Sequence, residues 1–199
     1  LEYAGIAPYE MEDDGHWLTQ KQTDLFNEIL VEKTNNPHIS RDAGRFVVLS
    51  GSFHTIRQFM IGFLSPAMIC AGLERITTHI TRGTTFSAQP IASNSYEVIA
   101  IPKPGVVEKP YQCDNRLGLL EGLSKSLTDR YAAIDHVECI HKGGKCCKYI
   151  MRWEISKLLV WKKIKRYALV LSPIVLFALY ILMPSLPHEY IIFSVLILV

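Results

Sequence analysis

Four side chains that can bind a metal ion are spaced along the second half of this chain. They are Cys113, in YQCDNR, and then His136, Cys139 and Cys147 in a later stretch. The later three follow the pattern H-x2-C-x7-C, and a segment that reads as a helix separates them from Cys113. Three thiols and an imidazole suit a closed tetrahedral zinc site, and such a site would require a fold that joins this helix to a later hairpin. The alternative is a set of ordinary buried cysteines, because free cysteine is among the most buried residue types.

The first half of the chain has the signals of helices. Thr19 and Gln22 form a capping-box pattern ahead of apolar residues at helical spacing. Ser65 followed by Pro66 predicts another helix, which should run to about Thr81. Two more helices are expected, one after Ser40 and one after Ser52.

The second half of the chain alternates in the manner of β-strands. Residues 84–89 and 95–102 are rich in β-branched and aromatic residues, and a short turn separates them. A helix is expected over about 114–127, followed by strands at 134–139 and 146–153 around a loop with two glycines. In the last strand, alternation places Cys147, Tyr149, Met151 and Trp153 on one face. Helices followed by antiparallel hairpins indicate an α+β domain.

The C-terminal part is apolar and predicts a membrane hairpin. Residues 167–183 carry no charge, and a second apolar run, 190–199, reaches the last residue, which suggests a fragment of a longer protein. Five basic residues precede the first run, so the positive-inside rule places the preceding domain in the cytoplasm. We therefore expect an inner-membrane protein with reduced thiols. The formal net charge of +2 gives no indication of nucleic-acid binding.

Residues 17–153 resemble a known family of sensory domains. The segments AGRF, GFLSPA, PYQCDNRLG and HVECIHKGGKCC are similar to the 4-vinyl reductase small-molecule-binding domain, which is related to the haem-NO-binding fold. The resemblance implies helices packed on an antiparallel sheet, and a zinc site with Cys113 as the distant ligand and His136, Cys139 and Cys147 as the others. Glu138 remains an alternative to His136, since the two would face the same side of a strand. The adjacent Cys146 is expected to face away from the site, and Cys70 to lie in the core.

The resemblance also implies a function. A cytoplasmic domain would bind a small hydrophobic or aromatic ligand in an apolar pocket and signal through the membrane to an output domain such as a histidine kinase or cyclase of a two-component system. Proteins of this type are commonly dimers, so a homodimer is also considered. The expected pocket residues are Phe53, Phe59, Met60, Phe63 and Met68.

The sequence leaves three alternatives to a ligand sensor. A haem or gas sensor would use an axial histidine, but the cysteine pattern fits the zinc-containing group better and argues against haem. Catalysis by this fragment is not expected, because the sequence has no dinucleotide fingerprint, P-loop or nucleophile elbow. A membrane-anchored interaction protein is the remaining alternative. The candidate axial ligands are His16, His38, His54 and His79.

These interpretations divide the chain into five parts. A lead-in segment (1–16) precedes the sensor domain (17–154), and a basic linker (155–166) joins it to the membrane part. The first span is expected at 167–183 and the start of a second at 190–199.

Overall fold

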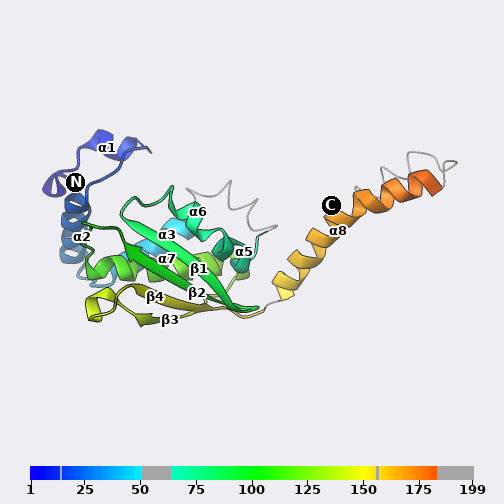
Figure 1. The fold of residues 1–199 in the computed structure, drawn as a ribbon. Helices are drawn as coiled ribbons and strands as arrows, with labels where there is room; N and C mark the ends of the chain where they lie inside the picture. The colour runs from blue at the N-terminus through cyan, green and yellow to red at the C-terminus, as the bar shows by residue number, and fades with distance from the viewer. Residues whose placement is uncertain (14, 51–63, 156, 183–199) are drawn as a thin grey trace.

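The computed structural model of this chain describes residues 1–13, 15–50, 64–155 and 157–182 (Figure 1). The expected helix after Ser52 lies outside these residues. In chain order the described elements are η1 (Glu2–Ala4), α1 (Pro8–Glu12), α2 (Gln20–Thr34), α3 (Ile39–Leu49), α5 (Pro66–Ala71), α6 (Leu73–Thr77), β1 (Thr84–Ala92), β2 (Ser95–Pro102), α7 (Pro110–Thr128), β3 (Ala133–Glu138), η3 (Ile140–Lys142), β4 (Cys147–Arg152) and α8 (Lys157–Leu182).

The four strands form one antiparallel sheet in the order β1-β2-β4-β3, which confirms the α+β class. The last strand alternates as predicted, since Cys147, Tyr149 and Met151 are fully buried and Trp153 is nearly so. Helices α5, α6 and α7 contact the sheet, and α3 packs along α7 (Figure 1). The core therefore lies between the sheet and these helices, and its members include Cys70, as expected.

Helices α3 and α7 approach each other closely because glycines lie at their crossing. A Cβ atom on Gly118 would lie 1.9 Å from the carbonyl oxygen of Arg41, and one on Gly44 would lie 2.3 Å from that of Asn115. Neither contact leaves room for a side chain, so the two backbones are in direct contact. Next to this crossing, the Glu121 carboxylate accepts hydrogen bonds from Arg41 and Arg45 of α3.

Several helix boundaries differ from the sequence prediction. Thr19 caps α2 as expected, because its hydroxyl accepts a hydrogen bond from the backbone N–H of Gln22. The helix predicted to run from Pro66 to about Thr81 is instead divided at Gly72 into α5 and α6. Gly72 has a low helix propensity, and its N–H bonds back to carbonyls of α5.

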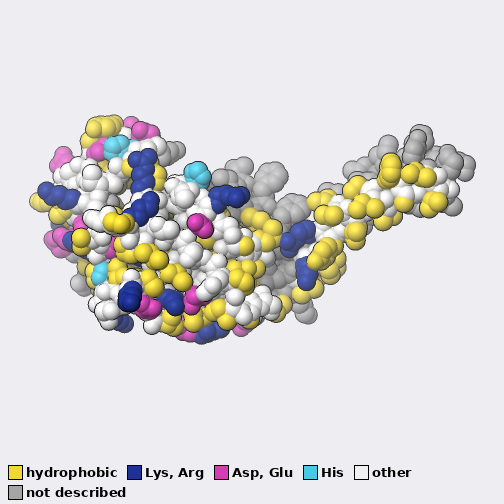
Figure 2. All heavy atoms as spheres, viewed as in Figure 1, with side chains coloured by type: hydrophobic (Ala, Val, Ile, Leu, Met, Phe, Trp, Pro, Cys, Tyr) yellow, Lys and Arg dark blue, Asp and Glu magenta, His cyan; other side chains and the backbone are white. Residues whose placement is uncertain are grey.

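The prediction of a membrane hairpin is wrong for the described residues. None of the helices among them is long and apolar enough to cross a bilayer. The basic linker and the first apolar run form one helix, α8, which projects from the domain with basic side chains near its start (Figures 1 and 2). The inner-membrane location depended on this hairpin and is corrected with it. Residues 190–199 lie outside the described part.

Candidate functional site

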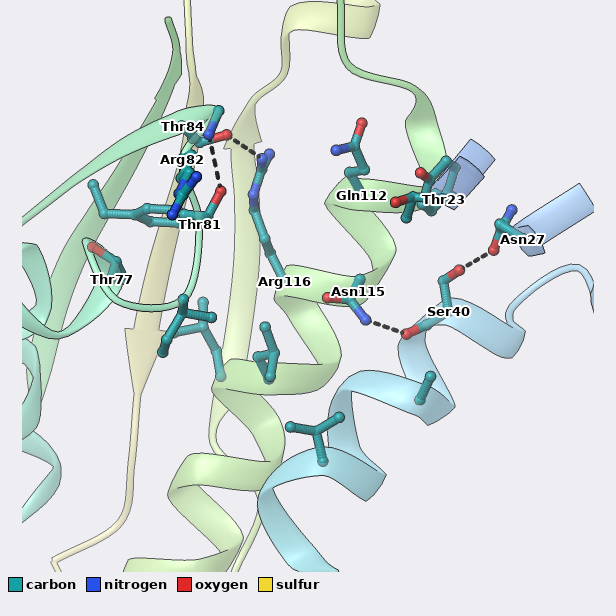
Figure 3. Close-up of a pocket in the computed structure, with 18 of the residues that line it drawn as sticks. Thr23, Asn27, Ser40, Thr77, Thr81, Arg82, Thr84, Gln112, Asn115 and Arg116 are labelled. Carbon is teal, nitrogen blue, oxygen red and sulfur yellow. Dashed lines mark hydrogen bonds between the residues drawn. The ribbon is translucent and has the colours of Figure 1, made fainter. Parts of the chain in front are cut away.

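A large cavity lies between helices α2, α3 and α7 and strands β1 and β2. Its volume is about 1580 Å³, which exceeds the 300–1,000 Å³ typical of small-molecule sites. Figure 3 shows polar side chains on two sides of it, with Thr23, Asn27 and Ser40 on one and Thr77 and Thr81 on the other. The cavity is thus framed by both halves of the chain.

The wall of the cavity is mainly apolar. Phe86 and Val98 project from the sheet, and Leu119, Leu120 and Leu123 from α7. Such a lining favours a ligand with a large apolar body, because its burial removes hydrocarbon surface from water.

The charged side chains of the described lining are mostly basic. The lining has one carboxylate, that of Asp24, and four basic side chains, which are Lys21, Arg82, Lys109 and Arg116. Lys109 Nζ lies 3.4 Å from Asp24 Oδ2 and 2.8 Å from Glu28 Oε1, so this charge is already balanced. The structure gives Lys21 and Arg82 no ionic partner among the described residues.

Arg116 is held by a buried polar network. Its Nη1 donates to Glu108 Oε2 at 2.8 Å, and its Nη2 donates to Thr84 Oγ1 at 3.2 Å (Figure 3). Burial raises the pKa of Glu108, but hydrogen bonds from Arg116 and Thr84 more than offset this, and the pKa lies below its usual value of 4.5. The pair is therefore charged, and it ties α7 to the start of β1.

Two tyrosines also line the cavity. Burial raises the pKa of both Tyr111 and Tyr149, so each phenol is protonated at neutral pH. The Tyr111 hydroxyl donates to Asp24 Oδ1 at 2.8 Å. The hydroxyl of Tyr149 is buried and has no hydrogen-bond partner among the described residues, and its ring stacks on His136 with centroids 4.3 Å apart.

The four predicted metal ligands come together behind this wall. The ligand atoms of Cys113, His136, Cys139 and Cys147 all lie within 4.8 Å of one another, and the Sγ atoms of Cys113 and Cys147 are 3.5 Å apart. In a tetrahedral site with metal–sulfur bonds of about 2.3 Å, ligand atoms lie about 3.8 Å apart. The Nε2 atom of His136 is buried and has no hydrogen-bond partner among the described residues, as expected of an atom suited to bind a metal ion.

The neighbouring candidates lie outside this cluster. The Glu138 carboxylate accepts a hydrogen bond from the backbone N–H of Lys145 at 2.9 Å, and the β3–β4 register shifts between His136 and Glu138. This shift separates the two side chains that regular alternation would place together. Cys146 is likewise not a member of the cluster.

The pocket residues proposed from the sequence are mostly outside the described part. Phe53, Phe59, Met60 and Phe63 belong to the segment 51–63. Met68 lies on α5, where it is 39% exposed and its sulfur accepts a hydrogen bond from Arg166, and it is not in the described cavity lining.

Three of the candidate axial histidines are described, and none of them lines the cavity. His16 Nε2 lies 2.9 Å from a carboxylate oxygen of Glu10, and His38 Nδ1 lies 3.4 Å from Asp114. His79 is exposed after α6, and His54 lies outside the described residues.

Comparison with known proteins identifies the fold. No family model and no curated protein matches the chain. An H-NOX protein from S. oneidensis in the Fe(II)NO ligation state matches with a TM-score of 0.56 and 14% identity, over 71% of this chain and 79% of that one. A structure concerned with the modulation of haem redox potential through protein-induced porphyrin distortion matches with a TM-score of 0.51 and 19% identity, over 69% of this chain and 78% of that one. A structure concerned with the molecular mechanism of H-NOX activation matches with a TM-score of 0.52 and 19% identity, over 70% of this chain and 76% of that one.

The chain has the H-NOX fold. At these identities the likeness shows the fold alone. It agrees with the predicted relation to the haem-NO-binding fold, whereas none of the comparisons supports the narrower resemblance to 4-vinyl reductase. The cofactor prediction is also corrected. The structures that share this fold are named for Fe(II) and haem, which contradicts the argument against haem, and none of the comparisons supports zinc.

The described lining fits haem in some respects. The cavity is large enough and apolar, and its basic side chains suit the acidic groups of a porphyrin. Haem iron is held in proteins by His, Cys, Met or Tyr. The described lining contains no His, Cys or Met, so an axial ligand from these residues would be Tyr111 or Tyr149.

Sequence reasoning missed the residues that frame the cavity. Arg116 lies in the quoted segment PYQCDNRLG but was not singled out there, and the roles of Arg82, Arg116 and Trp17 depend on partners far away in the chain.

Proposed function

We propose that this chain is a non-enzymatic sensory domain that binds a bulky apolar ligand in the cavity between its helices and sheet. The size and apolar lining of the cavity carry this proposal. Haem is the first ligand to test, because the solved structures that share the fold are named for it. An iron-free apolar molecule is the second candidate, and it is favoured by the lack of His, Cys and Met in the described lining.

A ligand in the cavity could influence the end of the domain through the sheet. Val98 and Tyr149 line the cavity on β2 and β4. Just beyond these strands, Trp153 is bound to Asn94 by two hydrogen bonds, of 3.1 and 2.8 Å. Helix α8 begins four residues after Trp153, so a shift of β2 or β4 would be passed on to α8.

For the Cys/His cluster we propose a structural role. The four side chains would bind a soft divalent ion and hold α7 against the β3–β4 hairpin. All four positions of a tetrahedral ion would then be occupied by protein, which leaves none for a substrate.

Binding to the purified full chain tests the proposed function. Haemin is added while the Soret absorbance is followed, and the neutral fluorophore N-phenyl-1-naphthylamine is titrated in parallel. We expect saturable binding of one or both. Failure of both to bind at micromolar concentration would contradict the proposal.

A variant with a partly filled cavity tests whether the ligand binds there. Leu119→Trp adds bulk to the described lining, and we expect it to weaken binding roughly tenfold or more. Val137→Trp, on the exposed face of β3, is the control and should bind as the wild type does. Equal binding by all three proteins would place the ligand outside the cavity.

A further inference from the structure

Arg82 is a cation of the cavity lining that has no ion pair with any described residue. It lies between α6 and β1, and its guanidinium is 4.3 Å from the centroid of the Trp17 ring. Trp17 precedes α2, so this contact joins the two sides of the cavity that Figure 3 shows apart. The structure gives Arg82 no ion pair and no side-chain hydrogen bond with a described residue.

The contact with the face of Trp17 leaves the N–H donors of Arg82 available. A guanidinium carries its five N–H groups in its own plane, and contact with an aromatic face occupies the π surface without using these donors. Carboxylate and sulfonate oxygens match two such donors at once. Arg82 is thus suited to bind an acidic group.

The surroundings of Arg82 favour the same kind of ligand. The described lining has four basic side chains and one acidic side chain, so its formal charge is +3. Arg116 and Lys109 are balanced by Glu108, Asp24 and Glu28, which leaves the unbalanced charge on Arg82 and Lys21. Lys21 and Arg82 are both exposed, but only Arg82 is held by an aromatic contact, with Trp17, and it is flanked by the lining residues Thr81 and Thr84 (Figure 3).

We propose that the ligand of this cavity is an organic acid with a large apolar body, and that Arg82, held on Trp17, binds its acidic group. The apolar part would lie against the leucines of α7. This inference rests on the proposed function and narrows its ligand class, because a neutral hydrocarbon would leave the charge of Arg82 unmatched.

Two dyes that share one fluorophore test this proposal on the full chain. The probe 8-anilinonaphthalene-1-sulfonate carries an acidic group, and N-phenyl-1-naphthylamine does not. We expect the sulfonate to bind more tightly than the neutral dye. Arg82→Gln should weaken sulfonate binding by roughly three- to tenfold and leave the neutral dye unchanged.

Two matched variants locate the effect. Arg75→Gln removes an exposed cation of α6 that does not line the cavity, and Lys21→Gln removes the other unbalanced cation of the lining. Both should bind the sulfonate within about twofold of the wild type. Circular dichroism of every variant checks that the fold is kept.

The outcomes separate the two proposals. If both dyes bind equally and Arg82→Gln has no effect, or if Lys21→Gln alone weakens the sulfonate, the assignment to Arg82 is wrong and the proposed cavity site stands. If neither dye nor haemin binds, the proposed function itself fails.

Discussion

At the scale of single residues, the buried pair of Arg116 and Glu108 is the most consequential contact near the cavity. The Glu108 side chain is fully buried and that of Arg116 is 9% exposed. Two charges taken out of water are tolerated only while each satisfies the other, so removal of one leaves an uncompensated buried charge.

Arg116→Met should therefore lower the free energy of unfolding by about 3–5 kcal/mol. Urea denaturation followed by tryptophan fluorescence measures this. The control is Arg130→Met, which removes one member of an ion pair with Glu154 whose side chains are 68% and 71% exposed. The control should leave the unfolding midpoint nearly unchanged, and an equal loss in both variants would contradict the assigned role of the buried pair.

The same pair predicts how stability depends on pH. Because the pKa of Glu108 in the folded state is below its usual value of 4.5, the stabilisation is present above about pH 4.5 and is lost as the pH falls through the lower folded value. Glu108→Gln should flatten this part of the curve of stability against pH. A curve between pH 3 and 5 that is parallel to that of the wild type would show that other carboxylates, such as Glu121, cause the acid transition.

At the scale of elements, the crossing of α3 and α7 decides how the helical layer forms one wall of the cavity. Gly118 and Gly44 allow the backbones to touch, and leucines of α7 line the cavity together with residues of α3. A larger residue at this crossing would push the helices apart.

Gly118→Ala should destabilise the domain by about 1–3 kcal/mol, because its Cβ would lie 1.9 Å from a backbone carbonyl that cannot move alone. Gly72→Ala is the matched control. The nearest heavy atom to its Cβ is 3.6 Å away, and alanine has the higher helix propensity, so this variant should be neutral or slightly more stable. Thermal unfolding compares the two, and a stable Gly118→Ala protein would refute the close packing.

At the scale of the whole molecule, the Cys/His cluster joins distant parts of the chain. Cys113 comes from α7, and the other three members come from β3, β4 and the residue after β3. An ion bound here would act on the fold as a cross-link, because the ligands are gathered only in the folded state.

Elemental analysis of the dialysed full chain should find about one soft divalent ion per molecule. Cys139→Ser should lose this ion and unfold less cooperatively, whereas Cys146→Ser, outside the cluster, should keep it. A wild-type protein that is stable and free of metal would show that the cluster is only a set of buried thiols.

The sequence by itself determined several local elements and the cysteines of the cluster. Alternation placed Tyr149 and Met151 on the buried face of β4, and the cap at Thr19 marked the start of α2, because both depend on neighbours within a few residues. The spacing of Cys139 and Cys147 predicted ligands that the fold does bring together.

Only the tertiary structure decided the cavity and its charge. Trp17 and Arg82, or Arg116 and Thr84, are far apart in the chain, and no local pattern reports that their side chains meet. The position of His136, and not Glu138, beside the three cysteines depended on a shift in strand register. That the basic linker and the apolar run form one helix, α8, was likewise decided by the structure. Local free energies set the elements, but long-range packing sets which side chains face one another, and the proposed function depends on the latter.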